Sequence, residues 1–297
     1  MAVAAGEATM ARATGAPGST RTAGARSGAM ARVAIYVLLL AGAALALLPM
    51  VWMVSASLMP TGDASAFPPR LFPRAVTLEH YRDLFTRLAL GRSLANSALI
   101  AAVVTAASVI VNSMAGYALA KLRFRGRAGV FRGLSIGLIL PSQVAMLPLF
   151  LLMKELHLVN TYWGVIIPGL ASIFAILLTY QYALAIPDDL LDAARVDGAS
   201  ELQIYRHVVL PVIAPILATL AIWTFLATWN DFMWPLIVLS DDRRYTLPVA
   251  LANLVGEHVQ DTELMMAGSV VTVLPVMLVF LFLQRYYVRG ITAGSVK

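Results

Sequence analysis

The chain of 297 residues contains no cysteine, which excludes disulfide bonds, thiolate nucleophiles and cysteine-based metal sites. None of its four histidines stands in the His-Glu-x-x-His spacing of a metalloprotease. The sequence also has no Gly-x-Ser-x-Gly nucleophile elbow. Because these signatures of catalysis are missing, we predict that the chain is not an enzyme and holds no metal.

Charged residues are also scarce. They make up 13% of the chain, whereas an average soluble domain carries about 25%. With 60% apolar residues and a mean hydropathy of +0.79, most of the chain belongs in a bilayer. The net charge of +6 does not indicate a nucleic-acid partner, because the basic residues flank apolar runs instead of forming a stripe.

Six apolar runs each have close to the roughly 20 residues that a helix needs to cross a membrane. We therefore predict an all-α integral membrane protein whose six-helix transmembrane domain occupies residues 32–287. The six runs are 33–58, 94–119, 133–153, 163–186, 208–228 and 265–284.

Basic residues beside these runs indicate the orientation. The short loop Lys121-Leu-Arg-Phe-Arg-Gly-Arg127 is dense in positive charge, and such loops stay in the cytoplasm. We predict that both termini are cytoplasmic, with the loop 187–207 and the tail 288–297 on the same side. The loop 59–93 holds five arginines and argues the other way. Its segment 77–85 predicts a short amphipathic helix near the outer membrane surface.

Residues 1–31 are mostly small or polar and include almost no large apolar side chains, so they cannot bury enough surface to fold. We predict a disordered cytoplasmic extension. A cleaved signal peptide is the alternative. However, the run 33–58 is long enough to span a bilayer, and no persuasive cleavage site follows it. Met10 and Met30 leave the true start of the protein open.

Residues 187–211, the coupling segment below, combine five acids and two arginines between two apolar runs. Pro187 and the two aspartates after it predict a helix start, and Gly198 can adopt the positive φ that ends the helix. Ser200-Glu-Leu-Gln203 predicts a capping box on a second short helix, and Pro211 predicts a local kink. Helix–glycine–helix pairs are also common in ordinary loops, so spacing alone leaves both interpretations open.

The sequence Asp192-Ala-Ala-x-x-Asp197-Gly198-Ala199, closed by Leu210-Pro211, resembles the EAA motif of permease subunits of binding-protein-dependent ABC importers. Asp192 replaces the usual glutamate, which keeps the charge but shortens its reach. In that family this loop is the coupling helix, which sits in a groove of the ATPase subunit. The resemblance implies a type I ABC importer permease bundle. The residues that it assigns to ATPase coupling are Asp192, Ala193, Ala194, Asp197, Gly198, Ala199, Leu210 and Pro211.

Two further segments resemble the carbohydrate-importer branch, particularly the second permease of maltose-type systems. Trp229-Asn-Asp-Phe-Met-Trp-Pro-Leu and Tyr245-Thr-Leu-Pro lie in residues 229–248, the outer loop below. Aromatic residues there also suit a membrane interface on their own. The resemblance implies that this loop faces a sugar-binding protein and that the tail contacts the ATPases. The residues concerned are Asp241, Tyr245 and Leu247 in the loop, and Gly290, Gly294 and Lys297 in the tail.

Pro141 and Pro148 interrupt the third apolar run. They predict a kink or an unwound turn, whose freed carbonyls neighbouring helices must satisfy. A translocation pathway could open at such a break, although prolines are common in membrane helices. Polar residues in or near the runs are candidates either for lining the pathway or for hydrogen bonds between helices. They are Asn96, Asn112, Gln143, Gln181, Trp223 and Asn230.

A transporter needs an energy source, and the sequence restricts where it lies. Proton- and sodium-coupled carriers usually place ionisable residues within the membrane, and the interiors of these runs have none. The three lysines, Lys121, Lys154 and Lys297, do not complete the Gly-x-x-x-x-Gly-Lys-Ser/Thr motif of an ATP-binding loop. We therefore expect no cofactor in this chain, and ATP and magnesium in a partner subunit.

These observations predict a permease subunit of an ATP-driven sugar importer in a bacterial inner membrane. The expected partners are a second permease, two ATPase subunits, an extracytoplasmic sugar-binding protein and membrane lipid. The absence of charge from the runs favours a neutral sugar over an anion. Two alternatives remain: an importer of glycerol 3-phosphate or a related small solute, and a non-transport membrane scaffold that recruits a partner through the acidic loop.

Overall fold

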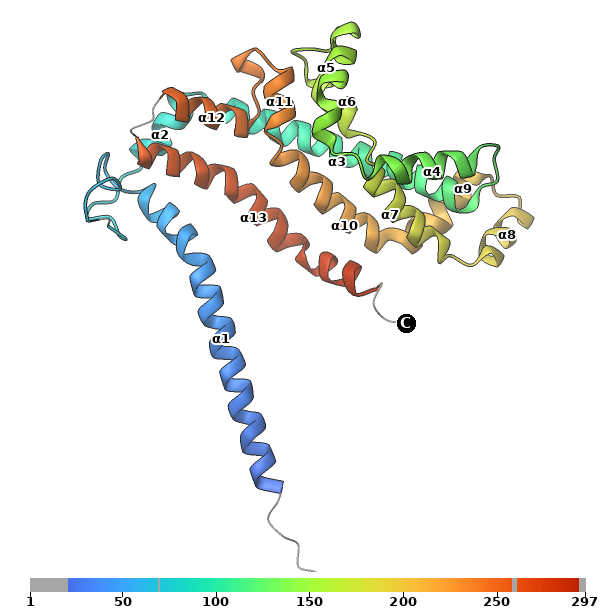
Figure 1. Ribbon diagram of the computed structural model, residues 1–297, viewed down its shortest axis with the longest axis horizontal. Helices are drawn as coiled ribbons and strands as arrows, with labels where there is room; N and C mark the ends of the chain where they lie inside the picture. Colours follow the sequence, from blue (N-terminus) through green and yellow to red (C-terminus); the bar gives the residue numbers. More distant parts are fainter. Residues whose placement is uncertain (1–20, 69, 258–260, 294–297) are drawn as a thin grey trace, which may run out of the picture. The chain divides into compact units, whose positions relative to one another are not determined.

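The computed structural model describes residues 21–68, 70–257 and 261–293, and the side chains of 32–68, 70–254 and 261–282. The chain divides into two compact units, residues 1–51 and 52–297. All regular elements in the described ranges are helices, as predicted (Figure 1).

The first unit contains most of helix α1 (Arg21–Ala56). Its 25-residue stretch from Arg32 is long and apolar enough to cross a membrane. The prediction of disorder up to residue 31 is wrong for 21–31, which are helical. Alanine, arginine and methionine are good helix formers, and they continue the helix beyond the apolar run. Residues 1–20 lie outside the described part.

Four predicted spans of the second unit also coincide with helices that could cross a membrane. They are Leu90–Lys121, Tyr162–Leu184, Glu201–Trp229 and Thr262–Phe282. The third apolar run is different. It forms α4 (Arg127–Gly137), then a short 3-10 turn η1 (Ser142–Ala145) and α5 (Met146–Glu155).

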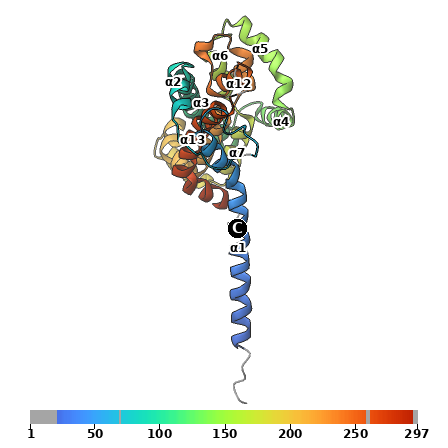
Figure 2. The same ribbon diagram turned by 90° about the vertical axis from the view of Figure 1, so that its left-hand side faces the viewer.

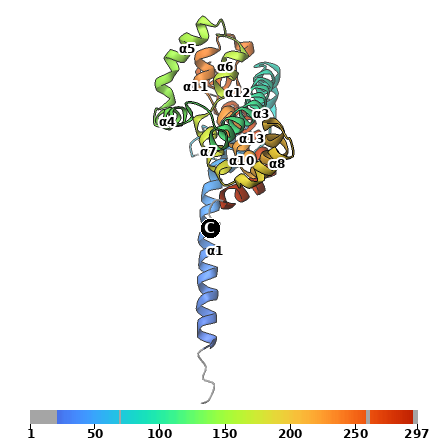
Figure 3. The same cartoon turned by 90° about the vertical axis from the view of Figure 1, so that its right-hand side faces the viewer.

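The two arms of this third run meet at 104°, so the described residues contain five candidate spans, or six if the bent pair counts as one. The predicted break in the run 133–153 is therefore confirmed. Pro141 lies at the break and has an extended ψ of 131°. The α4–α5 pair lies to one side of the other helices of the second unit (Figures 2 and 3).

Helix α3 (Leu90–Lys121) forms the centre of the second unit. It packs along α7 (Ile173–Leu184) and α10 (Leu210–Trp229), and α10 packs along α13 (Thr262–Ala293) (Figure 1). Gly116 allows α3 and α7 to pack closely together, because a Cβ at this position would lie only 2.8 Å from the Ile176 carbonyl oxygen on α7.

Short helices complete the fold at both ends of α3. The predicted amphipathic helix is confirmed as α2 (Glu79–Thr86), which buries His80 and Leu84. The others are α6 (Tyr162–Gly169), α8 (Asp188–Val196), α9 (Glu201–Ile204), the π-helical turn η2 (Tyr205–Val209), α11 (Met233–Val238), the 3-10 turn η3 (Asp242–Arg244) and α12 (Leu247–Glu257).

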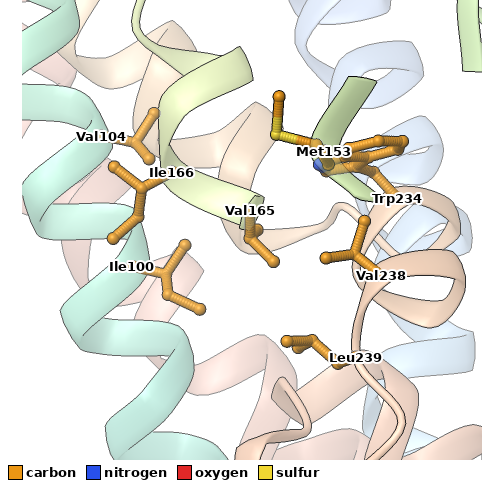
Figure 4. Close-up of a cluster of buried hydrophobic side chains, with 8 residues drawn as sticks. All are labelled: Ile100, Val104, Met153, Val165, Ile166, Trp234, Val238 and Leu239. Atoms are coloured by element: carbon orange, nitrogen blue, oxygen red, sulfur yellow. The ribbon is translucent and has the colours of Figure 1, made fainter. Parts of the chain in front are cut away.

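An apolar cluster joins α3, α5, α6 and α11 (Figure 4). Trp234 of α11 lies in it, and its indole nitrogen donates a 3.1 Å hydrogen bond to the Gly164 carbonyl of α6. The backbone N–H of Asn160 also donates to the Val238 carbonyl, at 2.8 Å. These bonds fix the orientation of the outer loop. The buried members are Ile100, Val104, Met153, Val165, Ile166, Trp234, Val238 and Leu239.

Candidate coupling site and outer cavity

The coupling segment begins as its sequence predicts. Helix α8 starts after Pro187, with two aspartates in its first turn. Gly198 has φ +82° just beyond the helix, and no atom lies within 4 Å of a Cβ built there, so the backbone angle alone calls for glycine. The predicted capping box is confirmed, because the Ser200 hydroxyl accepts from the Gln203 amide and the Gln203 side chain accepts from the Ser200 amide.

The second helix of the segment differs from the prediction of a separate short element. Helix α9 continues through the π-helical turn into α10, so that one helix runs from Glu201 to Trp229. Pro211 lies at the start of α10 and has no N–H to donate. The wider turn before it accommodates this loss without ending the helix.

Lys121, at the end of α3, holds the start of the coupling segment. Its ammonium donates to the Ile186 carbonyl at 2.6 Å and to an Asp188 carboxylate oxygen at 2.7 Å, and only 7% of its side chain is exposed. The hydrogen bond from Lys121, together with its positive charge, lowers the pKa of Asp188. The sequence predicted Lys121 only as part of a topology signal, since nothing in it showed this distant partner.

Arg195 joins the two helices of the coupling segment. Its guanidinium lies 2.7 Å from Asp192 and 2.9 Å from Glu201, and these two carboxylates raise the pKa of Arg195. The Tyr117 hydroxyl of α3 donates to the other Glu201 oxygen at 2.9 Å. Arg195, Glu201 and Tyr117 were not among the predicted site residues. The Tyr117–Glu201 contact joins residues 84 positions apart, whereas Arg195 bonds near neighbours that its spacing alone did not single out.

The outward face of the coupling segment carries small and apolar side chains. Ala193 is exposed, and Leu190, Val196 and Leu202 are 44%, 87% and 64% exposed. Ala194 and Ala199 are half-buried against the cluster beneath the segment. Asp197 and Gly198 are also exposed. Most of the predicted coupling residues therefore lie on one accessible surface that acidic groups flank, while Leu210 is half-buried and Pro211 is exposed where the segment enters α10.

The three predicted residues of the outer loop differ in their burial and in their contacts. An Asp241 oxygen accepts from the Arg243 amide at 3.0 Å, which lowers the pKa of Asp241. Tyr245 is half-buried. Leu247 is fully buried in the core, and its amide donates to the Ser97 hydroxyl. The prediction that Leu247 faces a binding protein is therefore wrong for its side chain in this structure.

Two of the predicted pathway residues are buried, and their side chains form hydrogen bonds with other parts of the chain. The Asn96 amide donates to the carbonyls of Arg243 and Tyr245, both at 3.0 Å, and its oxygen accepts from the Tyr162 hydroxyl. Asn112 is fully buried and bridges α3 to the segment between α6 and α7. For these two asparagines the structure supports the alternative role, hydrogen bonding between elements.

The remaining predicted residues differ in their surroundings. Gln181 is exposed on α7, and Trp223 is 57% exposed with its ring 5.7 Å from that of Phe174. Asn230 is exposed and donates to a carbonyl of its own helix. A pathway role for these residues stays a prediction. In the tail, Gly290 lies in α13 beyond the described side chains, and Gly294 and Lys297 lie outside the described residues.

Gln143 lines a cavity of about 400 Å³, the outer cavity below, which no sequence pattern predicted. Its walls come from α3, the break of the bent pair, α5, α6, the end of α10 and α11. The polar side chains that line it are Ser97, Ser142, Gln143, Thr228, Asp231 and Thr246. The proline break thus borders a largely apolar cavity that also contains several polar side chains. In the described residues, no group of three or more acidic or histidine side chains is suited to hold a metal ion.

Comparison with protein families identifies the chain. Residues 112–293, which include the whole coupling segment, match the family described as "Binding-protein-dependent transport system inner membrane component". The chain belongs to this family. As an inner membrane component of such a system, it is a multi-pass membrane protein and a transport permease, so the predicted family and location are confirmed.

Several family members are similar over most of their length. The arabinooligosaccharides permease AraQ of Halalkalibacterium halodurans is 42% identical over 226 residues, covering 76% of this chain and 81% of AraQ. The trehalose permease SugB of Mycobacterium tuberculosis is 35% identical, covering 85% and 93%. A crystal structure of a bacterial ABC transporter that imports the acidic polysaccharide alginate has a chain with a TM-score of 0.78 and 27% identity, covering 88% and 98%.

Proposed function

We propose that the chain is the permease subunit of an ATP-driven sugar importer, and that it pairs with a second permease, two ATPase subunits and an extracytoplasmic sugar-binding protein. The coupling segment is the observation that carries this proposal. It exposes a small, apolar surface flanked by acids, and it is tied to α3 through Lys121 and Glu201. A partner that moves this surface pulls on the central helix.

The substrate class is a neutral oligosaccharide or disaccharide. The relatives AraQ and SugB are named for arabinooligosaccharides and trehalose. The interiors of the six apolar runs carry no acidic, basic or histidine side chain to balance an anionic substrate. A partner ATPase binds ATP and magnesium. When ATP closes the ATPase pair, the coupling segments of the two permeases approach each other, and the bundle turns from inward-facing to outward-facing.

Substitution of Gly198 tests the coupling role. Gly198→Val forces a β-branched residue into a left-handed backbone, which costs about 1–2 kcal/mol and shifts the exposed turn. We expect normal membrane insertion but about tenfold less sugar transported per ATP hydrolysed in vesicles that hold the assembled importer. Gly62→Val is the matched control. Gly62 lies in the loop 59–93, has φ +90°, and has no atom within 4 Å of a Cβ built there. Wild-type coupling in Gly198→Val would count against the proposal.

Co-purification from native membranes in mild detergent tests the partners. We expect mass spectrometry to find an ATPase, a second permease and a sugar-binding protein with the chain. Recovery with partners that include no ATPase would favour the scaffold alternative.

A further inference from the structure

The outer cavity combines polar groups that the coupling mechanism does not use. Its volume of about 400 Å³ lies at the smaller end of the roughly 300–1,000 Å³ typical of small-molecule sites. Its lining includes hydroxyl, amide and carboxylate groups as well as apolar side chains of α3 and α6. Such a mixture suits a ligand that has both hydroxyl groups and C–H faces.

Thr246 supplies the first specific sign of a ligand. Only 4% of the residue is exposed, and its hydroxyl oxygen has no hydrogen-bond partner in the described part of the chain. A buried hydroxyl without a hydrogen-bond partner destabilises the folded chain. Since Thr246 lines the cavity, a molecule there with its own hydroxyl groups could remove this destabilisation.

Asp231 supplies the second sign. The residue is half-buried between α10 and α11, and its carboxylate accepts from the backbone amides of Trp234, at a long 3.4 Å, and of Met233. No ion pair among the described residues includes Asp231. Burial raises the pKa of its carboxyl. The cavity therefore contains a carboxylate with unused capacity to accept hydrogen bonds and without a neutralising cation.

The wall beside Asp231 is rigid. The hydrogen bond from the indole nitrogen to Gly164 fixes Trp234, and the ring belongs to the apolar cluster shown in Figure 4. Ile100, Val104 and Val165 belong both to this cluster and to the cavity wall. A preformed apolar wall of this kind is a suitable surface for the C–H face of a sugar ring.

We propose that the outer cavity binds one unit of a neutral sugar, with Asp231 accepting hydrogen bonds from sugar hydroxyls and Thr246 pairing with another. This inference rests on the proposed function and adds a substrate site within this chain. A carboxylate without a cation repels anions, so the site disfavours sugar phosphates and uronic acids.

The absence of native cysteine allows a direct test by protection from labelling. Thr228→Cys places a unique thiol in the cavity, and Ser240→Cys places one at an exposed position of the outer loop. The rate of modification by methyl methanethiosulfonate is measured on the assembled importer without binding protein, at rising concentrations of arabinotriose, trehalose or lactose. We expect at least one sugar to slow the modification of Thr228→Cys but not that of Ser240→Cys.

Two further substitutions test the assigned groups. Asp231→Asn and Thr246→Val, each combined with Thr228→Cys, keep the shape of the side chain. We expect Asp231→Asn to raise the half-protecting concentration about tenfold, as loss of a hydrogen bond to a charged group predicts. Thr246→Val should raise it a few-fold. Unchanged modification of the Ser240→Cys thiol in each background shows that the fold is intact. No protection by any sugar, or equal protection in both variants and the parent, would overturn the proposal.

Transport by the wild-type importer separates this inference from the proposed function. If ATP drives uptake of a sugar that the binding protein delivers, but that sugar protects no cavity thiol, the inference alone fails. If the assembled importer carries none of the sugars that its binding protein binds, the proposed function fails, and the cavity assignment fails with it.

Discussion

The coupling segment and the outer loop are both fastened to α3, but through different kinds of contact. Charged groups hold the first part of the coupling segment: Lys121 pairs with Asp188, whose side chain is 76% exposed. Further along the segment, the Tyr205 hydroxyl forms a buried 2.6 Å hydrogen bond with the Ser113 hydroxyl of α3. Neutral groups hold the outer loop: Asn96 donates to two loop carbonyls, and Ser97 accepts from the Leu247 amide. Asn96, Ser97 and Leu247 are all buried.

This difference has a mechanical consequence. Only the Asp188 side of the pair is exposed: water can solvate this carboxylate at little cost when the pair separates, and salt screens its charge, while the Lys121 side chain is buried. A buried amide that loses its partner has no such substitute. The attachment of the first part of the coupling segment to α3, the coupling attachment below, can therefore rearrange when a partner moves the segment. The attachment of the outer loop to α3, the outer attachment below, keeps the loop and the outer cavity in place.

The largest expected effect comes from breaking the buried attachment. Asn96→Ala leaves two loop carbonyls and the Tyr162 hydroxyl without their partner. We expect a loss of about 3 kcal/mol in the free energy of unfolding, measured by urea titration of the purified chain in detergent.

Asn230→Ala is the matched control, because Asn230 is exposed and bonds only a carbonyl of its own helix in the described structure. Its effect should stay within about 0.5 kcal/mol. Equal losses in the two variants would show that the outer attachment contributes no special stability.

A smaller effect is expected at the coupling attachment, where Lys121 contacts the start of the coupling segment. Lys121→Ala removes the bonds to the Ile186 carbonyl and to Asp188, but water replaces part of them. We expect a loss of about 1 kcal/mol in the free energy of unfolding. Sugar transported per ATP hydrolysed should fall more clearly than stability. Lys154→Ala, at an exposed lysine, should change neither measurement. A normal transport ratio in Lys121→Ala would show that this attachment does not transmit movement.

Local features of both regions were predictable from the sequence. Pro187, Gly198 and Ser200 define the turns of the coupling segment through backbone chemistry that depends on near neighbours only. The proline break of the third run follows from the same kind of rule. The angle of 104° at that break does not, since it depends on the side chains that pack around it.

Long-range contacts were not predictable. Lys121 and Asp188 are 67 positions apart, and Asn96 and Tyr245 are 149 apart. A single sequence gives no sign of which distant groups meet. The same limit explains the error at Leu247: its motif was found correctly, but its burial against α2, α3 and α13 is a property of the packed structure.

The smallest expected effect is the pH dependence of the Lys121–Asp188 pair. The folded chain lowers the pKa of Asp188, so the pair stabilises the fold fully above the ordinary carboxyl pKa of about 3.9. This stabilisation is lost as pH falls through the lowered pKa of the folded state. The difference in unfolding midpoint between the wild type and Asp188→Asn should therefore be constant from neutral pH to about 5 and shrink below about 3.9.

Asp189→Asn controls for the change in net charge, since no ion pair among the described residues includes Asp189. High salt should reduce the Asp188 difference, because the carboxylate is exposed and the pair is screened. If the difference persists unchanged at low pH and in high salt, Asp188 acts through a contact other than its charge. The coupling attachment would then resemble the outer attachment. The contrast between an attachment that can rearrange and one that stays in place would not hold.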